Sequence, residues 1–345
     1  MSFLLRPLVS LYQNNRATAN RAISAAWLSS IIWLALGELP FYPTQWRAVI
    51  AAGVLTVGLW TVEWAFYIAV LALLYPLYHI SIYVMVLFLA VAVLLRPVII
   101  THFNQTLLIV SIPILAQVHL EAVPALLAGL LWGAGSGMWV GGLAALWFKL
   151  LGGMSGFDID LGVLTSYSPN VNLIMDRFHT ASSLETLQRM VEPFAPSSIV
   201  ALSHLLQILA WGIAGYLAGG MARRRWMDEQ GLLGRVVCLL IGATLLSAGN
   251  LWIPVWLGLR PEEGITRLQV SLAVIDGLFA VLIAALLDSG RRFLNRPLLP
   301  RRQRRPAREP AGPSVESRRP VPLPQQLSEP VRSDKDDDVI MIELD

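Results

Sequence analysis

Cysteine, lysine and charged side chains in general are scarce in this chain of 345 residues. Its one cysteine, Cys238, excludes an internal disulfide framework and a cluster of thiolate metal ligands. Charged residues make up 14% of the chain, whereas about 25% is usual in soluble domains. Of its 26 basic residues only Lys149 and Lys335 are lysines, so arginine carries almost all of the positive charge. A composition so poor in charge excludes an ordinary soluble globular domain.

Motifs for familiar chemistry are also missing. The sequence contains no HExxH zinc motif, no GxSxG nucleophile elbow and no GxxxxGKS phosphate-binding loop, and its five histidines are scattered. We therefore predict that the chain is not an enzyme and holds neither a metal nor a cofactor. His119 and Glu121 lie close together at a predicted helix boundary, where an interfacial role is favoured over a metal or proton site.

Long apolar runs are what the chain has in abundance. Hydrophobic residues make up 55% of it, and there are 12 tryptophans, a residue favoured at membrane interfaces. A helix needs about 20 apolar residues to cross a bilayer. The sequence therefore predicts an all-α, polytopic membrane protein with about eight transmembrane helices. The predicted spans are 22–37, 47–75, 78–95, 98–119, 123–150, 197–221, 232–257 and 269–289.

Arginine near the helix ends predicts the orientation. The arginines gather at the N-terminus, at 223–225 and after 290, a pattern that indicates membrane topology rather than nucleic-acid binding. Eight spans place these three groups on one side, so both termini are predicted to be cytoplasmic and 152–196 to be an outer loop. Arg96 and Lys149 fall at outer ends, against the positive-inside rule. Either these two residues are functional or the 98–119 span is partly re-entrant.

The predicted spans divide the chain into four regions. Residues 1–21 are typical of an interfacial amphipathic segment, 22–76 hold two additional membrane helices, and 78–290 form a six-helix core. Residues 297–345 are rich in proline, arginine and acidic residues and have little apolar surface to offset chain entropy. We predict that this last region is a disordered cytoplasmic tail.

Small residues recur at every fourth position between 125 and 145. In one helix this spacing places them on one face, as a smooth strip about 30 Å long. Glycine costs about 0.8–1 kcal/mol against alanine inside a helix, but in lipid it lets a second helix approach closely. We predict that another helix or another subunit packs along this strip. Its members are Ala125, Gly129, Gly133, Gly137, Gly141 and Ala145, of which the four glycines are the predicted helix-packing residues.

Polar residues inside the last three spans indicate a ligand site. A charged residue in a span costs at least about 2.5 kcal/mol, so each such residue is a functional candidate, and small-molecule sites combine aromatic walls with a few polar groups. Alternatively, each residue merely bonds a neighbouring helix. Glu63, in the second span, lies outside this set and its role stays open. The predicted ligand-binding residues are His204, Gln207, Trp211, Asn250, Trp252 and Asp276.

The stretch PALLAGLLWGAGSGMWVGGLAALW, the outer loop and the helix ending GIAGYLAGGMARRRW resemble the substrate-binding S component of energy-coupling-factor vitamin transporters. The resemblance covers about residues 78–290. It implies six helices in a bacterial cytoplasmic membrane, with both ends on the cytoplasmic side. It also implies import of a vitamin-like solute, with a transmembrane coupling subunit and separate ATPases as partners. Small-residue strips dock that family on the coupling subunit, and the resemblance assigns this role to the four strip glycines. The two additional N-terminal helices, the outer loop and the tail depart from the family pattern.

Two other functional classes stay open. A membrane sensor or scaffold would use the helices to detect a ligand or lipid and the arginine-rich tail as its cytoplasmic output. A membrane enzyme acting on lipid would need acidic residues clustered at one interface. Asp158 and Asp160 are the one close acidic pair in the outer loop, and such a pair can hold a divalent metal. The sequence favours transport.

Overall fold

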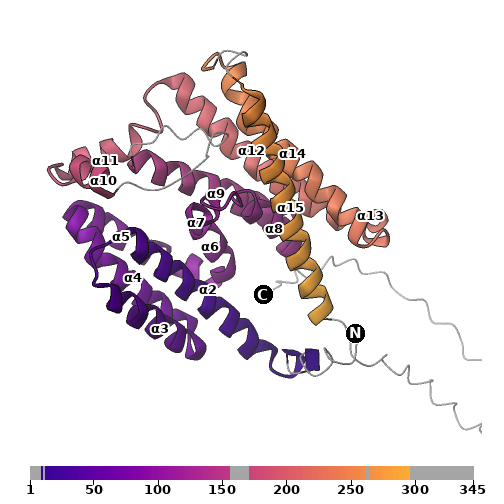
Figure 1. Ribbon diagram of the computed structural model, residues 1–345, viewed down its shortest axis with the longest axis horizontal. Helices are drawn as coiled ribbons and strands as arrows, with labels where there is room; N and C mark the ends of the chain where they lie inside the picture. Colours follow the sequence, from indigo (N-terminus) through magenta and orange to yellow (C-terminus); the bar gives the residue numbers. More distant parts are fainter. Residues whose placement is uncertain (1–8, 11, 156–170, 261–264, 296–345) are drawn as a thin grey trace, which may run out of the picture. The chain divides into compact units, whose positions relative to one another are not determined.

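The structure is a computed structural model that describes residues 9–10, 12–155, 171–260 and 265–295. Every regular element in these ranges is a helix (Figure 1). Seven helices are long and apolar enough to cross a membrane, so the chain is an all-helical, multi-pass integral membrane protein. These seven are α2 (Arg16–Glu38), α4 (Val62–Ile80), α5 (Ile82–Thr101), α9 (Ala134–Met154), α12 (Ser198–Ala222), α14 (Leu232–Trp256) and α15 (Arg267–Leu294).

Helices α2, α3 and α4 each run antiparallel to the next one along the chain. Between α2 and α4 lies α3 (Thr44–Trp60), and Arg21 near the start of α2 donates to the Trp60 carbonyl at the end of α3. Tyr42, just before α3, donates its hydroxyl to the Ala72 carbonyl in the second half of α4 at 3.1 Å. The beginning of each helix therefore lies beside the end of the next.

Three of the first four predicted spans have the wrong boundaries. Thr61 has an extended backbone with φ −145° and ψ 126°, so the predicted single span 47–75 is wrong and the chain reverses there between α3 and α4. The predicted boundary between 78–95 and 98–119 is also wrong, because Pro97 lies inside α5. Proline is tolerated inside membrane helices, where neighbouring groups satisfy the backbone groups that it frees.

Arg96 lies at the same end of the helices as Arg21. Its guanidinium pairs with Glu63, which lies at the beginning of α4, and sits 5.4 Å from the centre of the Tyr67 ring. The predicted placement of Arg96 at the opposite end followed from counting α3 and α4 as one span. Two helices in place of one reverse the direction of α5, which carries Arg96.

After α5 the chain forms two short helices in place of the predicted span. They are α6 (Phe103–Val110) and α7 (Ile112–Ala116), and a turn then leads into α8 (Val123–Trp132). The beginning of α6 lies beside the beginning of α9, where Gln105 donates to the Ser136 hydroxyl at 3.3 Å. Each of these three helices is too short to cross a bilayer.

Helices α8 and α9 form a tight antiparallel hairpin around Gly133. This glycine has φ 98° and ψ −179°, a backbone conformation that residues with a β-carbon rarely adopt. A methyl group on Gly141 would lie 3.1 Å from the Cβ of Ala125, so residues equally distant from Gly133 face each other. The predicted continuous helix over 123–150 is therefore wrong. Small residues at every fourth position occur both in one continuous helix and in two helices that fold back at a glycine. The sequence pattern therefore does not distinguish the two structures.

Helix α12 is central to the C-terminal half, where it packs against α8, α9 and α14 (Figure 1). Its Trp211 is completely buried in a hydrophobic core that includes Phe148 of α9 and Leu239 of α14. The short helix α13 (Arg225–Glu229) links α12 to α14, and α15 runs antiparallel to α14. Three helices match predicted spans within three residues at the start and five at the end: α12 for 197–221, α14 for 232–257 and α15 for 269–289.

Two helices lie inside the predicted outer loop 152–196. They are α10 (Val171–Phe178) and α11 (Ser183–Val191). Arg177 of α10 donates to the Gly153 carbonyl at 2.9 Å, which holds this segment against the end of α9. The described part of the loop is therefore largely helical and packed.

Several predictions fall outside the described residues. They concern residues 1–8 and 11 of the interfacial segment 1–21, the Asp158 and Asp160 pair, and the tail 297–345. The described residues, which end at 295, belong to one compact unit. The predicted boundary at 76 falls inside α4, so the chain carries no break there between additional helices and core.

Candidate functional site

Three of the predicted ligand-binding residues form a buried contact between α12 and α14. Trp211 donates its indole N–H to Asn250 Oδ1 at 2.9 Å, and Gln207 donates to the Asn250 carbonyl at 3.3 Å. All three residues are buried. Hydrogen bonds of this kind between membrane helices are worth about 0.6 kcal/mol each. Their contacts are those of a junction that holds α12 against α14.

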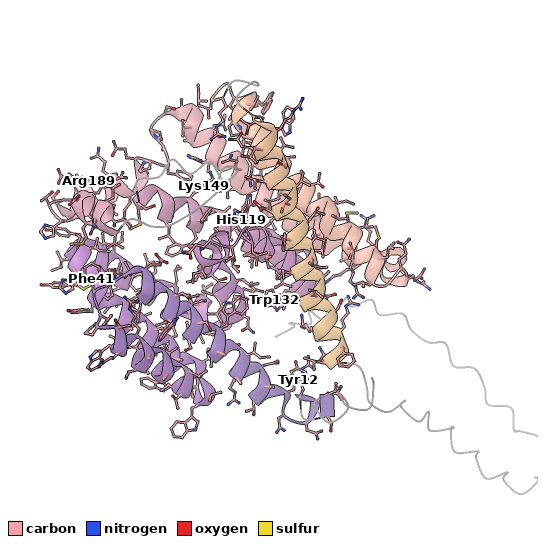
Figure 2. All side chains as sticks on the ribbon, in the orientation of Figure 1. Tyr12, Phe41, His119, Trp132, Lys149 and Arg189 are labelled. Carbon is pink, nitrogen blue, oxygen red and sulfur yellow. The ribbon has the colours of Figure 1, made fainter. Side chains whose placement is uncertain are left out.

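His204 and Trp252 lie apart from that junction. His204 Nδ1 is 2.6 Å from Nζ of Lys149, the lysine of α9, and the His204 ring stacks on Phe194. Lys149, labelled in Figure 2, is buried. Trp252 is 61% exposed. The structure therefore does not bring the six predicted residues together into one site.

Asp276, the last of the six, belongs to a different group of ionisable side chains. Its Oδ2 lies 3.4 Å from Nδ1 of His119, which is labelled in Figure 2 and lies in the turn between α7 and α8. Glu121, two residues further on, is buried and interacts electrostatically with both. We call His119, Glu121 and Asp276 the ionisable cluster. It joins a position well inside α15 to the beginning of α8.

An unusual backbone conformation positions this cluster. His119 has a φ of 58°, and in the described ranges it is the one residue other than glycine with a positive φ. Just after it, the Leu120 N–H donates to the Leu115 carbonyl at 2.8 Å, which closes the end of α7. This hydrogen bond is that of a Schellman motif, in which a residue in the left-handed conformation ends a helix. The sequence placed His119 and Glu121 at a helix boundary but carried no signal that Asp276 would meet them.

Burial raises the pKa of Glu121 to about 7. Loss of hydration is the largest cause, the Asp276 carboxyl adds to it, and a backbone hydrogen bond and His119 oppose it. Burial therefore favours the protonated, uncharged form of the Glu121 carboxyl group.

We expect the Glu121→Gln variant to lose part of the pH dependence of stability. Because the pKa of Glu121 is raised from 4.5 to about 7, its protonated form stabilises the native state fully below pH 4.5. This contribution is lost as the pH rises through about 7, and its full size is about 3 kcal/mol. The measurement is the melting temperature of both purified proteins against pH. Parallel curves across that window would contradict the assignment.

Two of the strip glycines face each other across the hairpin and also contact α12. Gly129 lies against Gly137, and both lie against the α12 backbone, Gly137 at Gly215 and Gly129 at Gly215 and Gly219. A methyl group on Gly219 would lie 2.5 Å from the Gly129 carbonyl oxygen. Three helix backbones therefore meet where only glycine leaves room, which is the kind of close contact that stabilises membrane helices.

The other two strip glycines have different neighbours. A methyl group on Gly141 would lie 2.6 Å from the Trp211 carbonyl oxygen of α12, while Gly133 lies against the Arg223 guanidinium. Gly129, Gly137 and Gly141 thus have their close neighbours in this chain. Docking on a coupling subunit, as the resemblance implies, would need a face other than the one these three glycines provide.

A cavity of about 750 Å³ lies at the other end of α8, between the beginning of α14 and the end of α15. It contains a buried ion pair between Arg235 and Asp288, with 3.0 Å between Nη1 and Oδ2. The six predicted ligand-binding residues do not line it. Sequence reasoning missed this pair, although Arg235 and Asp288 both lie in apolar runs, near span ends that were predicted to be on the same side of the membrane.

No protein family, curated protein or solved structure matches this chain. Among the residues that the structure describes, no group of three or more histidine, cysteine, aspartate or glutamate side chains is arranged to hold a metal ion. The function is therefore argued from the ionisable cluster and from the hairpin that carries it.

Proposed function

We propose that the chain is a membrane transport protein whose ionisable cluster lies on the path of a small solute. The observation that carries the proposal is the meeting of Asp276, well inside a long apolar helix, with His119 and Glu121 in a non-helical turn. Ionisable residues inside membrane segments are costly, and they mark substrate pathways and proton relays.

In this proposal α6, α7 and α8 form a re-entrant element. α6 begins at the end of the bundle where Gln105 meets Ser136, and α8 returns to Gly133 at that same end. The ionisable cluster lies at the turn between them. Irregular backbone at membrane depth is tolerated only where protein or a water-filled cavity surrounds it, and transporters bind substrates at such interrupted helices.

We infer eight membrane crossings with both ends in the cytoplasm. The 17-residue α3 joins the seven longer helices as a crossing, and the re-entrant element does not cross. Starting inside, this order places Arg96, Arg223 and Arg291 at cytoplasmic ends, in agreement with the positive-inside rule. Arg96 is then no exception, and the re-entrant explanation is favoured for the region after it.

We expect a cysteine at position 60 to react from the cytoplasmic side. Trp60 is 83% exposed at the reversal between α3 and α4, whereas a continuous span over 47–75 would bury this position in the membrane. The Trp60→Cys variant, in a Cys238→Ala background, is treated with a membrane-impermeant maleimide in inverted and right-side-out vesicles. Labelling should occur in inverted vesicles. The absence of labelling there, with Leu184→Cys in α11 labelled from outside as the control, would contradict the topology.

The specific form of transport that we propose is import of a vitamin-like solute, which this chain carries out with a coupling subunit and separate ATPases. The test is gentle purification from the native host, with mass spectrometry of the proteins and small molecules that co-purify, for wild type and Asp276→Asn. Recovery of ATPase subunits, and of a small molecule that Asp276→Asn loses, is the expected result. Recovery of envelope or signalling proteins without either would favour a membrane scaffold or sensor.

A further inference from the structure

We propose that the ionisable cluster of His119, Glu121 and Asp276 selects a solute with a positively charged organic group, such as a protonated amine. This inference rests on the proposed transport function, because it names the chemical class of the solute whose path the cluster lies on. Three features of the cluster support it: its balance of charges, a buried carboxyl group that no neighbouring residue satisfies, and a loose contact that is open on one side.

Negative charge outweighs positive charge in the cluster when both of its carboxyl groups are ionised. Of the basic side chains in the described ranges, only His119 interacts electrostatically with Glu121 or Asp276. His119 supplies at most one positive charge, whereas the two carboxylates supply two negative charges. A solute with a positive group would balance the charge that remains.

The Glu121 carboxyl group is buried without a partner on another residue. Glu121 is 9% exposed, and its carboxyl group forms a hydrogen bond with its own backbone. No other residue in the described part of the chain donates to it. Buried polar groups in proteins normally have such partners, so this exception needs an explanation. A positive group beside Glu121 would offset the hydration that its carboxylate loses on burial.

The contact between His119 and Asp276 is loose enough for a solute to take part in it. Nδ1 and Oδ2 are 3.4 Å apart, beyond the range of about 2.7–3.2 Å that is usual for N–H···O hydrogen bonds. The two side chains are 38% and 17% exposed, so the cluster is open on one side. Asp276 can therefore accept a hydrogen bond from an ammonium group as well as from His119.

An organic cation fits the cluster better than a metal ion does. A metal ion needs several ligand atoms at short, fixed distances, and the described residues include no group of three or more side chains arranged in this way. An ammonium group is a compact charge whose donors rotate, so it accepts a wider range of geometries. The imported solute is then a compound with an amine or another cationic nitrogen.

The experiment compares a positively and a negatively charged thiol reagent at the cluster. The purified full chain carries His119→Cys in a Cys238→Ala background, and the probes are trimethylammonium-ethyl and sulfonato-ethyl methanethiosulfonate. The measurement is the ratio of the two reaction rates at pH 8, where Glu121 is ionised because burial raises its pKa only to about 7. We expect a ratio at least about tenfold above that for free mercaptoethanol, because a negative site concentrates cations.

Further variants assign this selectivity to the two carboxyl groups. Adding Glu121→Gln or Asp276→Asn should lower the ratio, and adding both should return it to the mercaptoethanol value. The matched control adds Glu229→Gln, the same change at a carboxyl group that is 67% exposed in α13, and should leave the ratio unchanged. Val118→Cys, 60% exposed in the same turn, repeats the comparison with the cluster intact if His119→Cys does not fold.

Each outcome separates this inference from the proposed function. Equal relative rates for the two reagents would overturn the cationic solute but leave the transport function standing, since the cluster would still be reachable. A ratio that survives the loss of both carboxylates would overturn the assignment to the cluster. Failure of both reagents at positions 118 and 119 would show that no solute reaches the cluster, which would overturn the proposed function together with this inference.

Discussion

Replacing Gly137 with alanine lowers the stability of the purified protein by about 3 kcal/mol, at the upper end of what overpacking costs. The added methyl group would overlap the Gly215 carbonyl of α12 and approach the Gly129 Cα to 2.8 Å. Both neighbours are backbone atoms within helices, which cannot move aside as the end of a flexible side chain can. Three helices must therefore separate to admit one carbon atom. The measurement is thermal unfolding in detergent.

Gly135, two residues earlier in α9, is the matched control. A methyl group there would meet no atom within 4 Å, so Gly135→Ala should be neutral or stabilise by up to about 1 kcal/mol through helix propensity. The two variants make the same chemical change in the same helix. Equal melting temperatures for both would show that the glycine contact between α8, α9 and α12 does not hold the fold together.

The second large effect is expected for Asp288→Asn, which should cost about 3–5 kcal/mol. The side chains of Arg235 and Asp288 are only 9% and 7% exposed. Removal of the carboxylate charge leaves the Arg235 guanidinium without its buried counter-charge, and the cost of its lost hydration is no longer offset. Thermal or denaturant unfolding of the purified protein measures the loss.

An exposed ion pair provides the comparison. Arg225 and Glu229 are 94% and 67% exposed, so Glu229→Gln should change stability by less than about 1 kcal/mol. Replacing both buried partners with apolar residues, as Arg235→Met/Asp288→Leu, should recover most of the stability lost in Asp288→Asn. A double variant as unstable as Asp288→Asn would mean that the loss comes from packing rather than from the unpaired charge.

These regions meet along one short helix. The ionisable cluster lies at the beginning of α8, the glycine contact with α12 in its second half, and the arginine-lined cavity at its end. Arg291 also donates to the Leu131 carbonyl at 3.2 Å, so α15 contacts α8 at both ends. The 10-residue α8 is therefore held by packing rather than by its own length, which is marginal for an isolated helix.

The candidate site shows where reasoning from sequence stops. Depth along each predicted span grouped Gln207, Trp211 and Asn250, and these three residues do contact one another. Depth could not reveal that Asp276 faces α8 rather than α14, because the rotation of a helix about its axis depends on its neighbours. His119 and Glu121 were visible as a pair, yet their partner lies more than 150 residues away in the chain.

By itself the sequence determined the class of this protein and the positions of its last three long helices, because hydropathy acts residue by residue and needs no knowledge of neighbours. Its glycine spacing also required a close approach of helices. Only the tertiary structure decided that the chain reverses at Thr61 and at Gly133, so that one predicted strip became two facing surfaces with α12 against both. A chain reversal at a single residue costs little free energy locally. It is selected by the contacts between the helices on either side of that residue. The contacts with α12 join residues far apart in the chain, and no local pattern of residues encodes them.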